Sequence, residues 1–290
     1  MTPWVARAPS SIHEPFEARR PESPAGPSAL GQSGLTRLAH TIETEIVPNL
    51  VRAGRANRRE TARRGAPDWQ PDSGDVKEFA GLVLTRGDRV AASYIDWLRL
   101  RGTSMESIYL DLLAPSAQHL GTLWEEDHAD FAQVTVGLGR LQQIMREMSP
   151  AFLNEADPPL SGRRALIAPV AGEHHTFGAL MVGDFFARAG WTVKAPPSAT
   201  RRQLTDLVRR EWFCIVGLSL NNERLLGVLE EEIATIRAIS CNREIRVMAG
   251  GNVFVENPDL AMRLGADFSA TDARSATQAA DSALAALAEA

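Results

Sequence analysis

The chain has 290 residues and a formal net charge of −5, from 31 lysines and arginines against 36 aspartates and glutamates. Hydrophobic residues make up 44 %, enough for a sizeable core, and at roughly 150 residues per domain the length predicts about two domains. No apolar run approaches the ~20 residues of a membrane span, and residues 1–35 show no signal peptide. The mild acidity argues against a general nucleic-acid binder. Two cysteines, Cys214 and Cys241, are too few for a disulfide framework, so we expect a cytoplasmic protein.

Prolines dominate residues 1–34, with serine and glycine between them. Such a segment cannot bury enough apolar surface to offset the entropy lost on ordering, and it is interpreted as a disordered leader.

Residues 35–150 carry apolar side chains at helical spacing. The first pattern covers 35–50, with a bend at Pro48, and further patterns cover 74–85, 87–101, 104–124 and from 127 or 130 to 148. Ser104 is a plausible N-cap of the fourth. Short connections between these segments predict a bundle of four or five helices.

An arginine run follows the first of these helices. A charge run is most often a solvated surface, but this one makes a local positive field in an acidic chain and is a candidate contact for DNA or a protein partner. Its members are Arg52, Arg55, Arg58, Arg59, Arg63 and Arg64.

Residues 151–162, with two prolines and Gly162, are interpreted as a linker, and the pattern changes after them. From 163 to 290, five short apolar runs alternate with five helical stretches. This alternation predicts an α/β fold, a doubly wound five-stranded parallel sheet, preceded by the helical domain. The predicted strands are 165–170, 191–194, 213–218, 245–249 and 267–270. The predicted helices are 176–189, 200–210, 223–239, 256–264 and 273–289.

Unusual segments follow the first, third and fourth strands, at 172–178, 219–222 and 250–252. In such a sheet ligands bind beyond the carboxyl ends of the strands, so we expect these segments to converge on one site. His175 is the candidate metal ligand there, and Glu173 can accept its second ring N–H, which fixes the tautomer. Gly178, early in the next helix, permits close approach of a bulky planar group.

Features of enzymes are missing from the sequence pattern. No phosphate-binding glycine motif is present, and no serine stands in a nucleophile-elbow context. The acidic runs 125–127 and 230–232 have the pattern of exposed charge runs, outside the expected pocket. We therefore expect a binding protein without turnover of its own.

The three loop segments share an ordered motif. It reads Glu-x-His-x-x-Gly at 173–178, Ser-x-Asn at 219–221 and Gly-Gly at 250–251. Over about 125 residues this resembles the cobalamin-binding domains of the methionine-synthase type, whose signature is Asp-x-His-x-x-Gly, Ser-x-Leu and Gly-Gly. Glutamate for aspartate and asparagine for leucine are the two departures.

The resemblance implies a role for each motif residue. His175 would be the lower axial ligand of cobalt, in place of the dimethylbenzimidazole base of the cofactor, and Glu173 would be its hydrogen-bond partner. Ser219 would bind the displaced base, and Asn221 would form one wall of the slot for the nucleotide tail. The remaining pair, Gly250 and Gly251, would let the tail pass close to the backbone.

The helical region resembles the four-helix cap that precedes such domains. In that cap an aromatic residue, here Trp124, covers the upper face of the corrin; the alternative is a plain core residue. The upper-face histidine of the CarH group is missing at the matching positions. His128 could approach the upper face instead, or could be a solvated loop residue.

Segments 38–50 and 131–142 are similar to proteins of the AerR/PpaA type, which are cobalamin-binding, light-responsive antirepressors of photosynthesis genes. This resemblance implies hydroxocobalamin or adenosylcobalamin as cofactor and a PpsR/CrtJ-type repressor as partner. Two alternatives stay open: a corrinoid methyl carrier of a cobalamin-dependent methyltransferase system, and a variant that binds haem through His175.

Overall fold

The computed structural model describes residues 69–255 and 257–288, all within one compact unit, Gly54–Ala290. The predicted leader 1–34, the predicted helix 35–50 and the arginine run 52–64 lie outside the described residues.

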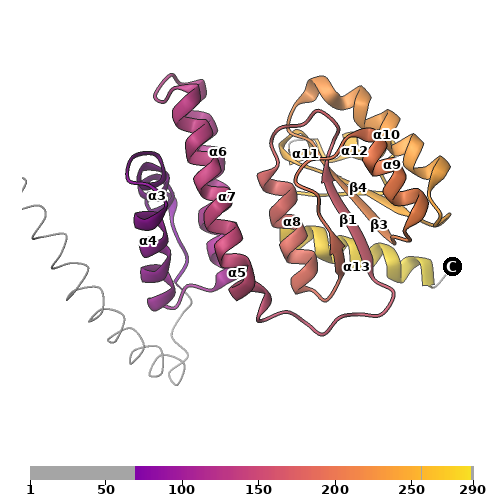
Figure 1. Cartoon of the computed structure of the whole chain (residues 1–290), viewed down its shortest axis with the longest axis horizontal. Helices are drawn as coiled ribbons and strands as arrows, with labels where there is room; N and C mark the ends of the chain where they lie inside the picture. The colour runs from indigo at the N-terminus through magenta and orange to yellow at the C-terminus, as the bar shows by residue number, and fades with distance from the viewer. Residues whose placement is uncertain (1–68, 256, 289–290) are drawn as a thin grey trace, which may run out of the picture. The chain divides into compact units, whose positions relative to one another are not determined.

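The N-terminal part of the described chain is helical (Figure 1). Two of its helices begin at capping boxes: Asp72 caps the first with Asp75, and Asp130 caps the last with Gln133. Ser104 caps a continuous helical stretch, as its position in the sequence predicts, by accepting from the amide of Ser107. The elements are α3 (Ser73–Thr85), α4 (Asp88–Leu100), α5 (Met105–Ser107), the π-helical η2 (Ile108–Leu113), α6 (Ala114–Glu125) and α7 (Phe131–Leu153).

Helix α7 runs into the segment predicted as linker. It ends at Leu153, past the predicted end at 148, although Pro150 removes one helical hydrogen bond. The reason is packing: Phe152 is fully buried, stacks on Tyr109 with ring centroids 4.3 Å apart, and lies 5.0 Å from the ring of Phe185. Burial of an aromatic ring outweighs the local preference of proline. The extended linker therefore starts after Leu153.

A five-stranded sheet follows, as the sequence predicts (Figure 1). All neighbouring strands are parallel, in the order β2-β1-β3-β4-β5. The strands are β1 (Arg164–Pro169), β2 (Thr192–Lys194), β3 (Ile215–Ser219), β4 (Arg246–Gly250) and β5 (Phe268–Ala270). The helices between and after them are α8 (Phe177–Arg188), α9 (Arg201–Arg210), η3 (Glu223–Leu225), α10 (Leu226–Ile239), α11 (Asn252–Val255), α12 (Asp259–Arg263) and α13 (Ala273–Ala288).

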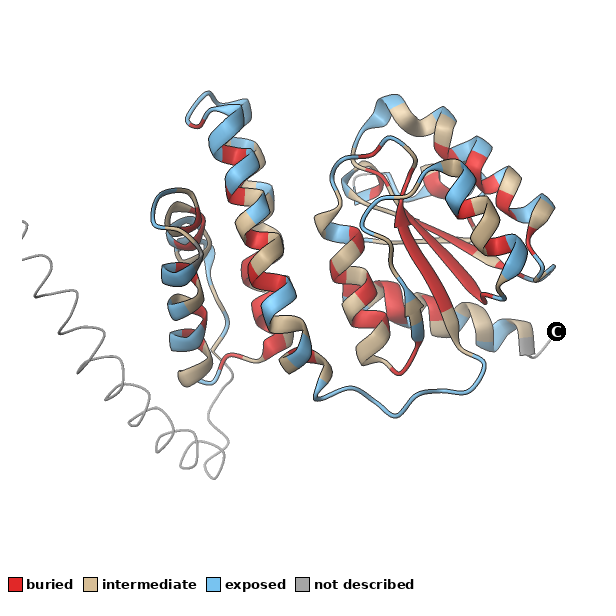
Figure 2. Ribbon diagram, viewed as in Figure 1, coloured by how far each residue is buried: buried red, intermediate tan, exposed pale blue. Residues whose placement is uncertain are grey.

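The central strands are buried on both faces, which explains their continuous apolar runs (Figure 2). Alternate residues such as Ile167 and Met248 face α8 and α13, whereas Leu166 and Val216 face α9 and α10. Helices on both faces make the sheet doubly wound. None of the helices in the described ranges is long and apolar enough to cross a membrane.

A polar seam joins the helical part to α8. Tyr109 and Ser149 donate to the two carboxylate oxygens of Asp184, at 3.2 and 3.0 Å. Burial raises the pKa of the Asp184 carboxyl more than these two hydrogen bonds lower it. The same burial, with the Asp184 charge, raises the pKa of Tyr109. The helical part and α8 therefore share a core and a partly buried acid.

Candidate functional site

Three loops meet at the carboxyl edge of the sheet, as the sequence predicts. Strand pairing sets Ser219 at the end of β3 directly between Pro169 at the end of β1 and Gly250 at the end of β4. The loops that follow these three residues therefore leave the sheet side by side.

Glu173 ties two of these loops together. Its side chain is 1 % exposed, yet its carboxylate accepts four hydrogen bonds. Oε1 accepts the amide of His175 at 2.8 Å and faces His175 Nδ1 at 2.6 Å. Oε2 accepts the amides of Asn221 and Asn222 at 2.8 and 3.0 Å. Although burial pushes the pKa of Glu173 upward, these donors outweigh it, and the pKa lies below its usual value.

The imidazole of His175 is oriented by this contact. With Nδ1 directed at the Glu173 carboxylate, Nδ1 carries the proton and Nε2 presents its lone pair. The side chain is 63 % exposed, and Nε2 has no hydrogen-bond partner among the described residues. An oriented, accessible imidazole nitrogen is a suitable ligand for a single metal atom that is brought in by a cofactor.

Asn221 joins the third loop to the other two. Its amide donates to Glu173, and its side-chain Oδ1 accepts from the amide of Asn252 at the start of α11. The preceding Gly251 has φ +110°, and a Cβ there would lie 2.2 Å from the carbonyl oxygen of Leu220. Only glycine fits this turn. The Asn221 departure from the usual motif thus contributes a hydrogen bond between loops.

The remaining sheet-edge residues are small and leave space. A Cβ on Gly178, the second residue of α8, would meet nothing within 4 Å, and one on Gly250 would only touch the Ala270 oxygen at 3.5 Å. Ser219 is half-buried and pairs with Pro169 and Gly250. A Cβ would therefore fit at Gly178 and Gly250, in contrast to Gly251.

The helical part reaches the same edge through α7. Gln142 Nε2 donates to the hydroxyl of Thr176, the residue after His175, at 3.1 Å. Both residues lie in segments singled out from the sequence, Thr176 in 172–178 and Gln142 in 131–142, but the contact between them was not predicted.

Trp124 and His128 lie at the α6–α7 end, apart from this network. Trp124 is 51 % exposed and is not part of the core of the described chain, so the core-residue alternative is wrong. His128 faces Glu126 at 3.2 Å, on a surface loop. No hydrogen bond joins either side chain to the His175 loop within the described ranges.

One acidic run differs from its sequence interpretation. Glu230 and Glu231 are exposed as expected, but Glu232 is 2 % exposed and accepts from the amide of Ala171 at 3.2 Å. Ala171 lies in the loop that carries Glu173, two residues before it. A carboxyl group that the sequence placed in a solvated run therefore contacts the backbone of this loop.

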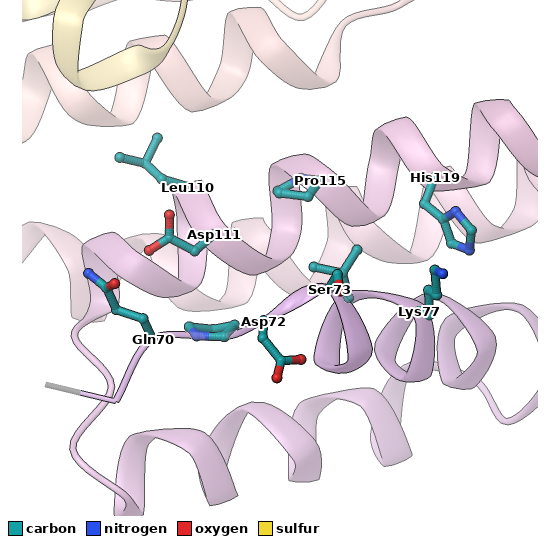
Figure 3. A pocket seen from close by; sticks show the side chains of 10 residues that line it. Gln70, Asp72, Ser73, Lys77, Leu110, Asp111, Pro115 and His119 are labelled. Atoms are coloured by element: carbon teal, nitrogen blue, oxygen red, sulfur yellow. The ribbon is translucent and has the colours of Figure 1, made fainter.

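Two surface hollows lie elsewhere. One is lined by Gln70, Asp72 and Lys77 near the start of α3 and by Asp111 and His119 from η2 and α6 (Figure 3). The second lies against α9, lined by Ser198, Gln203 and Arg210 among others. No group of three or more metal-ligating side chains occurs in the described residues. The candidate site is thus an open edge with a single imidazole.

Comparisons with known proteins agree with this geometry. Residues 163–280 match the family model described as the B12 binding domain. An uncharacterized 20.5 kDa protein in the bchF-crtJ intergenic region of Rhodobacter capsulatus is 24 % identical over 177 residues, which are 61 % of this chain and 92 % of that protein. The monomethylamine corrinoid protein of Methanosarcina barkeri has the same fold, with a TM-score of 0.62 at 12 % identity over 72 % of this chain and 98 % of that one. The predicted cobalamin-type domain and its parallel-sheet fold are confirmed.

Proposed function

We propose that the protein is a cobalamin-binding regulator of the AerR/PpaA type that acts in the cytoplasm. The match of residues 163–280 to the B12 binding domain model supports the proposal. One observation carries the proposal: Glu173 holds His175 with Nδ1 occupied and Nε2 exposed. This is the arrangement that an imidazole needs to act as the lower axial ligand of cobalt.

The residues around His175 fit a corrin with a nucleotide tail. Gly178 leaves open space next to the ligand, and Gly250 and Ser219 offer a small, polar-tipped strand edge. A haem lacks such a tail, so these residues favour cobalamin. When bound, an alkylcobalamin supplies a cobalt–carbon bond that light can break.

The contacts between α7, η2 and α8 suggest how binding could be sensed. Gln142 contacts Thr176 next to the ligand, and Tyr109 and Ser149 share the Asp184 carboxylate. If a cofactor binds one arrangement of these contacts more tightly, its binding raises the population of the helical conformation that has this arrangement. The altered surface then binds a repressor.

The partner is proposed as a PpsR/CrtJ-type repressor. The relative in Rhodobacter capsulatus is a protein from the bchF-crtJ intergenic region, which supports a link to that class of gene. Direct contact of the arginine run with DNA or with the repressor remains part of the proposal. The protein would have no turnover of its own, and the likeness to a corrinoid protein concerns the fold.

Replacement of the ligand tests cofactor binding. The wild type, His175→Ala and His174→Ala would be incubated with hydroxocobalamin, adenosylcobalamin or hemin and passed through a desalting column. We expect His175→Ala to retain at least tenfold less cobalamin and to lose the axial-ligand bands, because a ligand bond is removed, while the adjacent His174→Ala behaves like the wild type. Equal retention by wild type and His175→Ala, or preferential retention of hemin, contradicts the proposal.

Titration of the repressor tests regulation. Its affinity would be measured against apo-protein and cobalamin-loaded protein, in the dark and after illumination. We expect at least a fivefold difference between two of these states, which corresponds to about 1 kcal/mol of coupling. Indistinguishable affinities, combined with methyl transfer from a methylated corrinoid in cell extract, would favour the methyl-carrier alternative.

A further inference from the structure

Glu232 occupies a position where the helix pattern calls for an apolar residue. It shares the buried face of α10 with Leu229, Ile233 and Ile236, at helical spacing. Its relative exposure is 2 %, whereas Glu230 and Glu231 on either side of that face are exposed. Burial of a carboxyl group costs stability unless it makes hydrogen bonds, so its presence calls for a role.

The contact that Glu232 makes is directed at the ligand loop. Oε1 accepts the amide of Ala171 at 3.2 Å, and Oε2 is buried with no hydrogen-bond partner among the described residues. Within the described residues the carboxyl group therefore makes one hydrogen bond, and that bond is to Ala171, two residues before Glu173.

The loop itself is a tight turn with an anchor at each end. Val170 donates to the carbonyl of Ser219, Gly172 has φ +88°, and the amide of Glu173 returns to the carbonyl of Val170 at 2.8 Å. Among the described residues, the acceptor of the Ala171 amide is Glu232. A shift at Ala171 would move Glu173, and the direction of the His175 ring depends on Glu173.

We propose that Glu232 is a positioning residue for the cobalt ligand, acting through the Ala171 amide on the turn that carries Glu173 and His175. This inference rests on the proposed role of His175. Burial raises the pKa of the Glu232 carboxyl, and this outweighs the lowering by the Ala171 bond and by Arg201, which pairs with Glu231. The hydrogen bond to Ala171 requires an acceptor oxygen at this position, and a glutamine side chain also offers one.

The test compares three variants of the full chain with the wild type. Glu232→Leu removes the acceptor, Glu232→Gln keeps it without the charge, and Glu231→Gln is the matched control, because Glu231 is exposed and only pairs with Arg201. The free-energy cost of leaving an amide without its acceptor corresponds to a change of roughly tenfold or more in an equilibrium constant. We expect Glu232→Leu to bind hydroxocobalamin roughly tenfold more weakly and with weaker axial-ligand bands, while Glu232→Gln and Glu231→Gln stay within about twofold of wild type.

Amide hydrogen exchange in apo-protein gives a second readout that needs no cofactor. The Ala171 amide should exchange at least tenfold more slowly than that of His174, whose amide has no acceptor among the described residues. Glu232→Gln should keep this protection. The exchange comparison in wild type and Glu232→Gln decides the matter even if Glu232→Leu does not fold.

Three results would overturn the inference, and the first two are an Ala171 amide that exchanges as fast as that of His174 and a folded Glu232→Leu with unchanged axial-ligand bands. An equal loss in Glu232→Gln and Glu232→Leu would also overturn it, since the acceptor would then not be the cause. Failure of the wild type to bind hydroxocobalamin, with Ala171 protected, would instead point to the proposed function as the error.

Discussion

The two regions assigned to the two faces of the corrin are built in opposite ways. At the sheet edge, the buried Glu173 carboxylate and the Asn221 side chain link three loops by hydrogen bonds. At the α6–α7 end, Trp124 and Phe131 are 51 % and 71 % exposed, and Figure 2 shows this end mostly in the exposed colour. One region is fixed before a ligand arrives, and the other keeps apolar surface uncovered. The sheet edge around His175 is thus preorganised, and the α6–α7 end can adapt.

Removal of Glu173 should break the preorganised region and have the largest effect. Glu173→Ala removes the acceptor of three backbone amides, those of His175, Asn221 and Asn222, and we expect the free energy of unfolding of apo-protein to fall by about 3 kcal/mol or more. Urea denaturation measures it, with the exposed Glu223→Ala as control, for which we expect a change within about 0.5 kcal/mol. A loss below about 1 kcal/mol would mean that the loops are not held by this side chain.

The same residue predicts a pH dependence. Its pKa is lowered in the folded protein, so the carboxylate stabilises the fold above the unfolded pKa of about 4.5, and this contribution is lost as the pH falls through the folded value. The difference in unfolding free energy between wild type and Glu173→Ala should therefore shrink below about pH 4.5. Asp184 and Glu232 have raised pKa values, so their effect on the pH dependence of stability has the opposite sign. The readout is therefore the difference in unfolding free energy between wild type and Glu173→Ala, in which these two contributions cancel. A difference that stays constant down to pH 3 would contradict the assignment.

The adjacent glycines Gly250 and Gly251 should differ in role: we expect Gly251 to be required for the fold and Gly250 for cofactor binding. At Gly251 a Cβ would lie 2.2 Å from a backbone oxygen at positive φ, so Gly251→Ala should cost about 2 kcal/mol or more of apo stability. Gly250→Ala introduces only an ordinary contact and should cost less than about 1 kcal/mol. If the nucleotide tail passes Gly250, that variant should still bind hydroxocobalamin more weakly. Thermal unfolding and equilibrium dialysis check the pair, and normal cofactor binding by Gly250→Ala would remove Gly250 from the site.

Local patterns were sufficient to predict much of the fold and the site. Short apolar runs marked β1, β3 and β4 because these central parallel strands are buried on both faces, whereas the edge strands β2 and β5 are more exposed. The Glu173–His175 contact followed from a spacing of two residues, and the meeting of the loops followed from the rule for strand ends. Such arguments work where neighbours in sequence or in strand order decide the contact.

Long-range packing explains what the sequence did not reveal. Glu232 looked solvated because it lies in a run of three glutamates, although its spacing to Leu229, Ile233 and Ile236 was a usable signal. Helix α7 passed Pro150 because Phe152 packs on Tyr109 and Phe185, residues 43 and 33 positions away. No sequence motif relates Gln142 to Thr176, so their contact was not predicted. These contacts depend on tertiary packing that a single sequence does not encode locally.

The smallest expected effect concerns the adaptable region. Trp124→Ala and Phe131→Ala remove exposed aromatic rings, so apo stability should change by no more than about 0.5 kcal/mol, as for the exposed Val90→Ala on α4. If these rings cover the upper face of the corrin, adenosylcobalamin should bind a few-fold more weakly and its photolysis should change in rate, because less apolar surface encloses the cobalt–carbon bond. Val90→Ala should leave both unchanged. A large loss of apo stability in Trp124→Ala would show that this end is fixed like the sheet edge and would remove the contrast. Unchanged adenosylcobalamin affinity and photolysis in both variants would instead preserve the contrast in rigidity but assign the upper face of the corrin to other residues.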